Sequence, residues 1–290
     1  MATLSEKLNN GRFVVTSELT PPKGTDLEAL FEAAQFIAPV VDAVNLTDSH
    51  SSRMSLAPIA AAHQLIDRGV EPIVQMTTRD RNRIALQSDM LGAAALGVSN
   101  LVCMGGDPPQ NGDHPDAKPV FDLGTADLIA AANGLNAGKD LAGNALNQPT
   151  RFCIGAVVNP GARDLDLEIA RLEEKAAAGA TFFQTQAVYD ATAFEGFLAR
   201  IAHLDVRILA GILPIKSVKM ACYMNDNVPG IDIPDALIAT IEQAADVADA
   251  STTIAAETIR TISPWCAGVH VMALGWERRI PEILERAGVR

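Results

Sequence analysis

Short apolar runs alternate along the chain with longer stretches in which apolar residues recur every three or four positions. The short runs are rich in Val, Ile and Phe and predict strands, whereas the amphipathic stretches predict helices. The expected strands are 13–18, 43–47, 71–77, 100–104, 152–157, 182–186, 206–211 and 268–274. The expected helices are 26–37, 55–68, 81–96, 164–178, 191–201 and two within 234–262.

This alternation predicts an α/β fold with a parallel sheet and right-handed crossovers. Eight strand–helix units in 290 residues favour a single-domain (β/α)8 TIM barrel over residues 1–290. A doubly wound open sheet is the alternative, but no GxGxxG follows the first strand and no P-loop is present. The widest interruption, at about 108–150, predicts a long loop over the carboxyl face, a helix at 125–135 and a surface excursion of small residues.

Composition narrows the class of protein. The net charge of -12 disfavours a nucleic-acid partner, and no run of apolar residues is long enough for a membrane span. The first residues lack the pattern of a signal peptide, so we expect a cytoplasmic protein. The four cysteines lie far apart in the sequence and form no CxxC pair, so we expect neither a metal site nor a disulfide framework.

The first strand ends in a carboxylate. Glu18 closes the run 13–18, and Pro21 and Pro22 then prevent the strand from continuing. In α/β proteins the carboxyl ends of the strands hold the chemistry, so Glu18 is a candidate catalytic residue. The structural alternative is a carboxylate at the rim that caps a helix or pairs with an arginine.

Other polar side chains are expected at the same ends of the strands. They include Thr47, Gln75, Asp107, Asn159 and Gln186. This mixture of amides, hydroxyls and two carboxylates suits a polar heteroaromatic ligand better than a metal ion. Each has a structural alternative: GGDPP at 105–109 could be only a turn, and Gln186 could satisfy backbone groups of the barrel. His270 is expected to be structural, and the run 79–83 is expected to be a solvated helix start.

Taken together, several strings resemble the methylenetetrahydrofolate reductase family. They are SELTPP at 17–22, VNLT at 44–47, GGDPP at 105–109, TQAVYD at 185–190 and AGILPI at 210–215, in family order and across almost the whole chain. The segments 112–122 and 268–277 are most similar to the short reductases of acetogens and related bacteria. The resemblance implies a TIM barrel that moves a hydride onto the one-carbon unit of folate.

The resemblance also implies roles for particular residues. Glu18 matches the general acid, Asp107 a catalytic carboxylate beside flavin and pterin, and Gln186 a glutamine that contacts folate. The resulting cofactor-binding set is Thr47, Gln75, Asp107, Lys118, Asn159 and Lys175. The implied cofactor is a flavin, FAD rather than FMN, with NADH or NADPH as electron donor.

Several departures from the family pattern leave a flavin-independent form open. Gly105 replaces the usual arginine, and Met220 and Met224 replace a glutamine and a phenylalanine.

The chemistry implied by this resemblance requires an acid. The methylene group bridges two nitrogens, and the ring must open to an iminium ion before a hydride can attack. A neutral Glu18 would supply that proton, and we expect burial to raise its pKa. An ionised Asp107 would stabilise the resulting cation. Two other functions stay open: a folate-binding methyltransferase, or a folate-binding subunit supplied with electrons by a partner protein. A homo-oligomer is also open.

Overall fold

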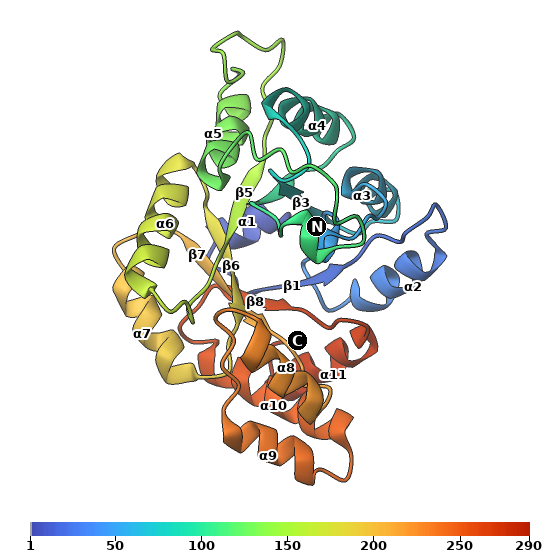
Figure 1. Cartoon of the computed structure of the whole chain (residues 1–290), viewed down its shortest axis with the longest axis vertical. Helices are drawn as coiled ribbons and strands as arrows, with labels where there is room; N and C mark the ends of the chain where they lie inside the picture. The colour runs from blue at the N-terminus through green and yellow to red at the C-terminus, as the bar shows by residue number, and fades with distance from the viewer. Residues whose placement is uncertain (1) are drawn as a thin grey trace.

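The computed structural model describes residues 2–290, which form one domain around a closed barrel of eight parallel strands (Figure 1). Each strand pairs with its neighbours in sequence, and β8 pairs with β1 to close the barrel. This confirms the predicted (β/α)8 architecture. The strands are β1 (Val14–Leu19), β2 (Ala43–Leu46), β3 (Pro72–Thr77), β4 (Asn100–Met104), β5 (Cys153–Val158), β6 (Phe182–Ala187), β7 (Arg207–Ile212) and β8 (Gly268–Val271).

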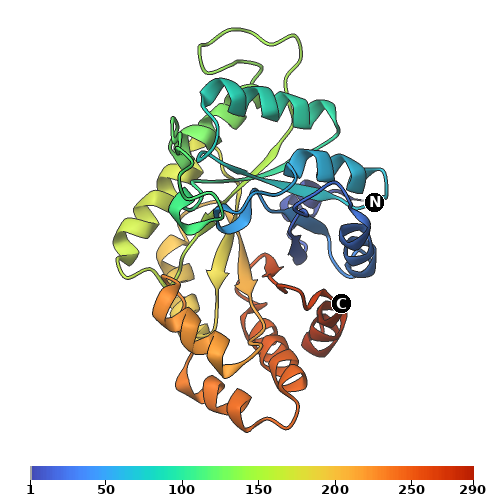
Figure 2. The ribbon, with the colours of Figure 1, turned by 45° about the vertical axis from the view of Figure 1, so that its right-hand side comes forward.

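The helices surround the barrel, and most lie where the sequence pattern predicts them (Figures 1 and 2). Three were not assigned from the pattern: α1 (Leu4–Asn9), α8 (Val218–Asn227) and α11 (Ile280–Ala287). The others are α2 (Glu28–Ile37), α3 (Pro58–Ile66), α4 (Arg83–Ala95), α5 (Thr125–Asn136), α6 (Leu165–Ala178), α7 (Ala191–Ile201), α9 (Asp235–Gln243) and α10 (Val247–Ile262). Short 3-10 turns are η1 (His50–Ser52), η2 (Pro109–Asn111) and η3 (Glu277–Arg279).

The lower part of the barrel interior is apolar and closed. Leu4 and Leu8 of α1 are buried against side chains of the strands, among them Val14, Ile73 and Phe182. Removing these side chains from water favours the closed barrel by roughly 25 cal/mol per Å² of apolar area. Chemistry is therefore confined to the opposite end, at the carboxyl ends of the strands.

Above this apolar floor, the interior becomes polar. Alternation along the strands places Thr16, Asn45, Gln75, Gln184 and His270 inside, each at most 8% exposed. TIM barrels usually fill this space with branched apolar side chains. A polar layer here is expensive unless its members bond to one another, so its presence points to a functional mouth above it.

The two excursions from the barrel lie at opposite ends of the longest axis of the molecule, which is vertical in Figure 1. The segment after α5 carries an antiparallel bridge between Lys139 and Ala145 and protrudes at the top of Figure 1. At the bottom, α8, α9 and α10 enclose a second apolar cluster that includes Ile215, Ile233 and Ile241. Within residues 2–290, no helix has both the length and the apolar character that crossing a membrane requires.

Candidate active site

Glu18 stands at the barrel mouth beside His270. Residues of β1 alternate so that Thr16 and Glu18 face inward, and the turn at Pro21 and Pro22 ends the strand just beyond. The Glu18 side chain is 14% exposed, and its Oε2 lies 3.6 Å from Nε2 of His270, which is 4% exposed. Because β8 pairs with β1 in the register Thr16 to His270, closure of the barrel brings this pair together.

A chain of hydrogen bonds continues from His270 across the barrel. Its Nδ1 lies 2.9 Å from Oγ1 of Thr16 and 3.3 Å from Nε2 of Gln184. Gln184 and Asn45 then exchange two amide hydrogen bonds, of 2.7 Å and 3.0 Å, between β6 and β2. The polar layer is therefore internally paired, which fixes the imidazole directly beneath the Glu18 carboxyl.

The protonation of Glu18 differs from the expectation. Burial is the largest influence and favours the neutral acid, but the proximity of His270 opposes it, helped by His50 and Gln75. The pKa of Glu18 is lowered overall. The prediction that burial raises this pKa is therefore wrong, because the sequence alone does not reveal that β8 brings a histidine to the carboxylate.

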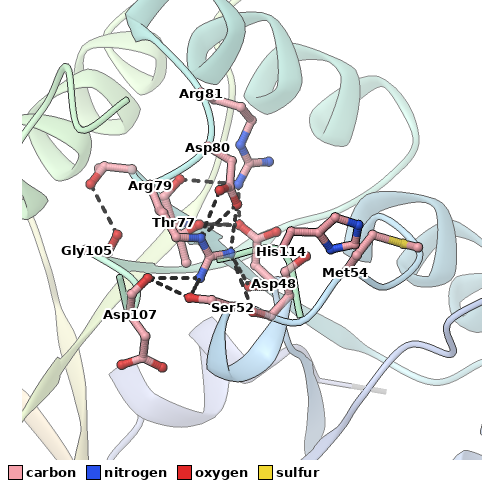
Figure 3. Close-up of polar contacts among 12 residues, drawn as sticks. Asp48, Ser52, Met54, Thr77, Arg79, Asp80, Arg81, Gly105, Asp107 and His114 are labelled. Carbon is pink, nitrogen blue, oxygen red and sulfur yellow. Dashed lines mark hydrogen bonds and ion pairs between the residues drawn. The ribbon is translucent and has the colours of Figure 1, made fainter. Parts of the chain in front are cut away.

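Arg79 joins the loops around the mouth, as Figure 3 shows. Its side chain is 3% exposed. Its guanidinium donates to Asp80 and, at 3.1 Å, to Oγ of Ser52, with longer contacts to the carbonyl oxygens of Asp48, Ser49 and Asp107. The prediction of a solvated helix start over 79–83 is therefore wrong for Arg79, because two loops that are distant in sequence, after β2 and after β4, enclose the guanidinium.

Asp107 is held by its backbone while its carboxylate remains available. The carbonyl of Asp107 accepts a hydrogen bond of 2.7 Å from Oγ of Ser52, and Arg79 approaches the same oxygen. The carboxylate points away from this network in Figure 3 and is exposed. Ser52 itself has a φ of 57°, a left-handed conformation that a serine adopts only when its surroundings impose it. The loop thus fixes the position of Asp107 without neutralising its charge.

The strand β6 is irregular at Gln186. The strand register shifts between Gln184 and Ala187, and Thr185 bonds both to the Gln186 carbonyl and to the amide of Gly211. Bulges of this kind re-aim side chains next to active sites. Gln186 is half-buried, and its Oε1 accepts from the amide of Ala187. Its amide nitrogen makes no hydrogen bond within residues 2–290.

The residues predicted to hold a cofactor differ in burial and in whether their side chains are already hydrogen-bonded to the protein. Thr47 is 1% exposed, and its hydroxyl has no partner among the described residues, which suits a ligand contact. Gln75 is buried beside Glu18. Lys118 is exposed in the loop between β4 and α5.

Two of these residues are already engaged by backbone groups. The Asn159 side chain bonds to the carbonyl of Pro229 and the amide of Gly161. The Lys175 ammonium donates to the carbonyl of Val157 at 2.8 Å, and burial lowers its pKa.

This arrangement does not fit the anionic tail of a flavin. Lys175 and the guanidinium of Arg79 are directed at protein oxygens, and Gly105 supplies no charge where the family resemblance implies an arginine. An added Cβ at Gly105 would meet only Oγ1 of Thr125, at 3.7 Å. The position therefore leaves room beside Asp107 but no cation. The flavin contacts of Asn159 and Lys175 stay predictions that require these hydrogen bonds to exchange.

Two hollows adjoin the mouth on either side of Thr20. One has a volume of about 300 Å³, includes Glu18 and lies between the loops that follow β1 and β8. The other has a volume of about 550 Å³ and is lined by Thr20, Pro21, Lys23, His50, Arg53, Met54, Ser55, Gly112 and Asp113. A ligand bound at the mouth therefore has space to extend outward along cationic side chains.

The comparison with protein families decides the classification. A family model described as methylenetetrahydrofolate reductase matches residues 3–288. The chain belongs to this family. The fission yeast Schizosaccharomyces pombe has a relative, methylenetetrahydrofolate reductase 2, that is 24% identical over 99% of this chain and 47% of its own length. A 5,10-methylenetetrahydrofolate reductase of Pectobacterium carotovorum is 25% identical over 72% of this chain and 66% of its own.

The chain thus spans about half the length of the first of these methylenetetrahydrofolate reductases. Among solved structures, a protein from Clostridium thermocellum that binds two copies of 5-methyl-5,6,7,8-tetrahydrofolic acid superposes with a TM-score of 0.65. It is 18% identical, and the match covers 98% of this chain and 97% of that protein. A 2,3-dimethylmalate lyase superposes with a TM-score of 0.55 at 13% identity. At such identities these structures show that the barrel is shared, and nothing further.

Sequence reasoning missed two parts of this reductase-family site. One is the contact of His270 with Glu18, and the other is the network around Arg79. The sequence does indicate a polar barrel interior, because polar residues two positions apart recur in Thr16 and Glu18 and in Gln184 and Gln186. Such spacing places both members of each pair on the same face of a strand. No comparable pattern marks Arg79.

Proposed function

We propose that this chain interconverts 5,10-methylenetetrahydrofolate and 5-methyltetrahydrofolate by hydride transfer, with Glu18 as general acid. The observation that carries the proposal is the half-buried Glu18 carboxyl at the mouth, above a polar layer and beside His270. Membership of the methylenetetrahydrofolate reductase family supports the reaction class. The activity, the substrate and the electron donor of this chain are parts of the proposal.

Glu18 has the surroundings that proton delivery to a folate nitrogen requires. The bridging carbon of methylenetetrahydrofolate is bonded to two nitrogens, and protonation of one turns it into a leaving group. The partly exposed carboxyl can meet a ligand from the mouth, while its inner side keeps the contact with His270. Positioned acids of this kind contribute about 10²–10⁴-fold to reaction rates.

Asp107 and Gln186 are proposed to bind the pterin. The exposed carboxylate of Asp107 can accept hydrogen bonds from an amino group, and a negative charge there favours the iminium cation. The Gln186 amide nitrogen can donate to a ring carbonyl or nitrogen. Because Asp107 is fixed by its backbone and Gln186 by the bulge, both are held before a ligand arrives.

We propose a nicotinamide, NADH or NADPH, as the electron donor. If a flavin bound here, FAD rather than FMN, it would act as the hydride carrier. Among the expected contacts, Thr47 is best suited to bind it, because its hydroxyl has no hydrogen-bond partner among the described residues. The other expected flavin contacts do not fit as they stand, so we derive no step through that group. Direct transfer from the nicotinamide requires only that both substrates occupy the mouth together.

The hollow of about 550 Å³ that is lined by Lys23, His50 and Arg53 is proposed to bind the glutamate tail of folate. Lys23 is paired with Asp113, but Arg53 is exposed and makes no ion pair within residues 2–290. We therefore expect Arg53→Gln to raise the KM for a folate with several glutamates by about threefold to tenfold and to leave kcat unchanged. Arg200→Gln, at an exposed ion pair on α7, is the control. Equal KM values for the two variants would contradict this role.

The direct test is product formation by the purified protein. Methylenetetrahydrofolate and NADH or NADPH are supplied, methyltetrahydrofolate is quantified, and the visible spectrum is recorded before and after reduction. Turnover without a yellow chromophore would support direct transfer from the nicotinamide. A yellow protein bleached by methyltetrahydrofolate would support a flavin instead.

Two other outcomes would favour the alternative functions. Turnover only in a complex with another protein would favour an electron-accepting subunit. Methyl transfer to an added acceptor without any oxidation of nicotinamide would favour a methyltransferase.

A further inference from the structure

The two ring nitrogens of His270 face groups of different kinds. Nε2 faces Oε2 of Glu18 at 3.6 Å, and Nδ1 faces Oγ1 of Thr16 at 2.9 Å. A carboxylate only accepts hydrogen bonds, so it favours a proton on Nε2. A hydroxyl both donates and accepts, so it can serve Nδ1 whether or not that nitrogen carries a proton.

His270 can therefore change its charge without any movement of heavy atoms. When Nδ1 is protonated, it donates to Thr16, whose hydroxyl can turn toward the carbonyl of Val269, 3.5 Å away. When Nδ1 is bare, it can accept from Thr16 or from the Gln184 amide at 3.3 Å. The Asn45–Gln184 pair keeps this surrounding frame in place in both states.

This freedom matters because Glu18 alone does not hold its proton well. Its pKa is lowered, mainly through His270, so the carboxyl is ionised under conditions in which a general acid should be protonated. The other groups that face it are His50, from the loop after β2, and the neutral Gln75 of β3. Apart from Glu18, the side chains within hydrogen-bonding distance of His270 are Thr16 of β1 and Gln184 of β6, and both are neutral. His270 is thus the buried titratable group in contact with the acid.

We propose that His270 is the positioning residue that stores the proton delivered by Glu18. The inference rests on the proposed function, since it concerns the source of that reaction's proton. In this proposal, the pair that is loaded for catalysis is the Glu18 carboxylate facing an imidazolium. As the folate ring opens, the N–H bond at Nε2 breaks, the proton passes through the carboxyl, and a new N–H bond forms on the folate nitrogen. The pair is left as carboxylate and neutral imidazole, and water restores the proton.

The pH dependence of kcat tests this role. His270→Gln keeps an amide that can bond to both Glu18 and Thr16 but carries no ionisable proton. At about pH 7 we expect kcat to fall about 10²-fold, folate KM to change by less than about threefold, and activity to recover toward lower pH as Glu18 is protonated directly. The control is His203→Gln, at an exposed pair with Glu173. A His270→Gln profile parallel to that of the wild type would overturn the proposal.

A second measurement needs neither substrate nor turnover. The chain has five histidines, so ring-nitrogen NMR spectra of labelled protein are simple enough for His270 to be assigned by substitution. Removing the carboxylate charge in Glu18→Gln should move the titration of the His270 ring to lower pH. An identical titration in wild type and Glu18→Gln would overturn the proton store, even if His270→Gln failed to fold. If the titration of His270 shifted in Glu18→Gln but the wild-type protein did not reduce folate, only the proposed function would be refuted.

Discussion

Replacing Arg79 tests whether the loops of the mouth are held by one side chain. Arg79→Met keeps most of the apolar stem but removes the guanidinium, and with it the 3.1 Å hydrogen bond to Ser52 and the contacts to three loop carbonyls. The ion pair with Asp80 contributes little, because Asp80 is 48% exposed.

The structure sets the size of the effect. A hydrogen bond from a charged donor contributes about 1.5–3 kcal/mol, and the carbonyl contacts of 3.4–3.5 Å are too long to add as much. We therefore expect a loss of about 2–3 kcal/mol and a fall in Tm of about 4–12 °C. Folate KM should also rise, because the carbonyl of Asp107 loses one of its two donors.

Thermal unfolding followed by circular dichroism measures the change in Tm, and steady-state kinetics measure the KM. Arg200→Met removes a guanidinium from an exposed pair and should leave both quantities almost unchanged. If Arg79→Met had the same Tm and the same folate KM as the wild type, other contacts would hold the loops and the role of Arg79 would be refuted.

Two further predictions concern the barrel and its thiols. Gly155→Ala would place a Cβ 2.3 Å from the Phe182 ring, so we expect the free energy of unfolding to fall by about 1–3 kcal/mol in chemical denaturation. Adding Phe182→Leu should partly restore it. Additive losses in the double variant would contradict the clash. Burial raises the pKa of Cys103 to about 12, so a thiol reagent should modify the exposed Cys222 in the native protein and reach Cys103 only on unfolding. Rapid native labelling of Cys103 would argue against its burial.

The barrel could be predicted because each of its units repeats a local pattern. All eight strands lie within about two residues of their predicted positions at their start, since strand length and apolar content are local properties. Two of the three missed helices, α1 and α8, have identifiable reasons. α1 has only 6 residues, too few to show a period, and α8 has few buried positions, Ala221 and Met224. Their stability comes from tertiary packing, which no local pattern contains.

The site was predicted less completely, because its decisive contacts join distant parts of the chain. Glu18 could be identified as a residue at a strand end, and its place at the barrel mouth agrees with that prediction. His270 is separated from it by nearly the whole sequence and meets it only when β8 closes on β1. The charge state of Glu18 depends on that meeting, and so does the position of Asp107 on the loops joined by Arg79.

Folate reduction by Glu18→Gln, compared with its affinity for methyltetrahydrofolate, tests directly whether Glu18 is the general acid. The amide keeps the size and hydrogen-bonding capacity of the side chain but cannot release a proton, so we expect unchanged binding and a fall in the reduction rate of at least about 10²-fold. Reduction by Glu18→Gln at close to the wild-type rate, with binding intact, would contradict the account.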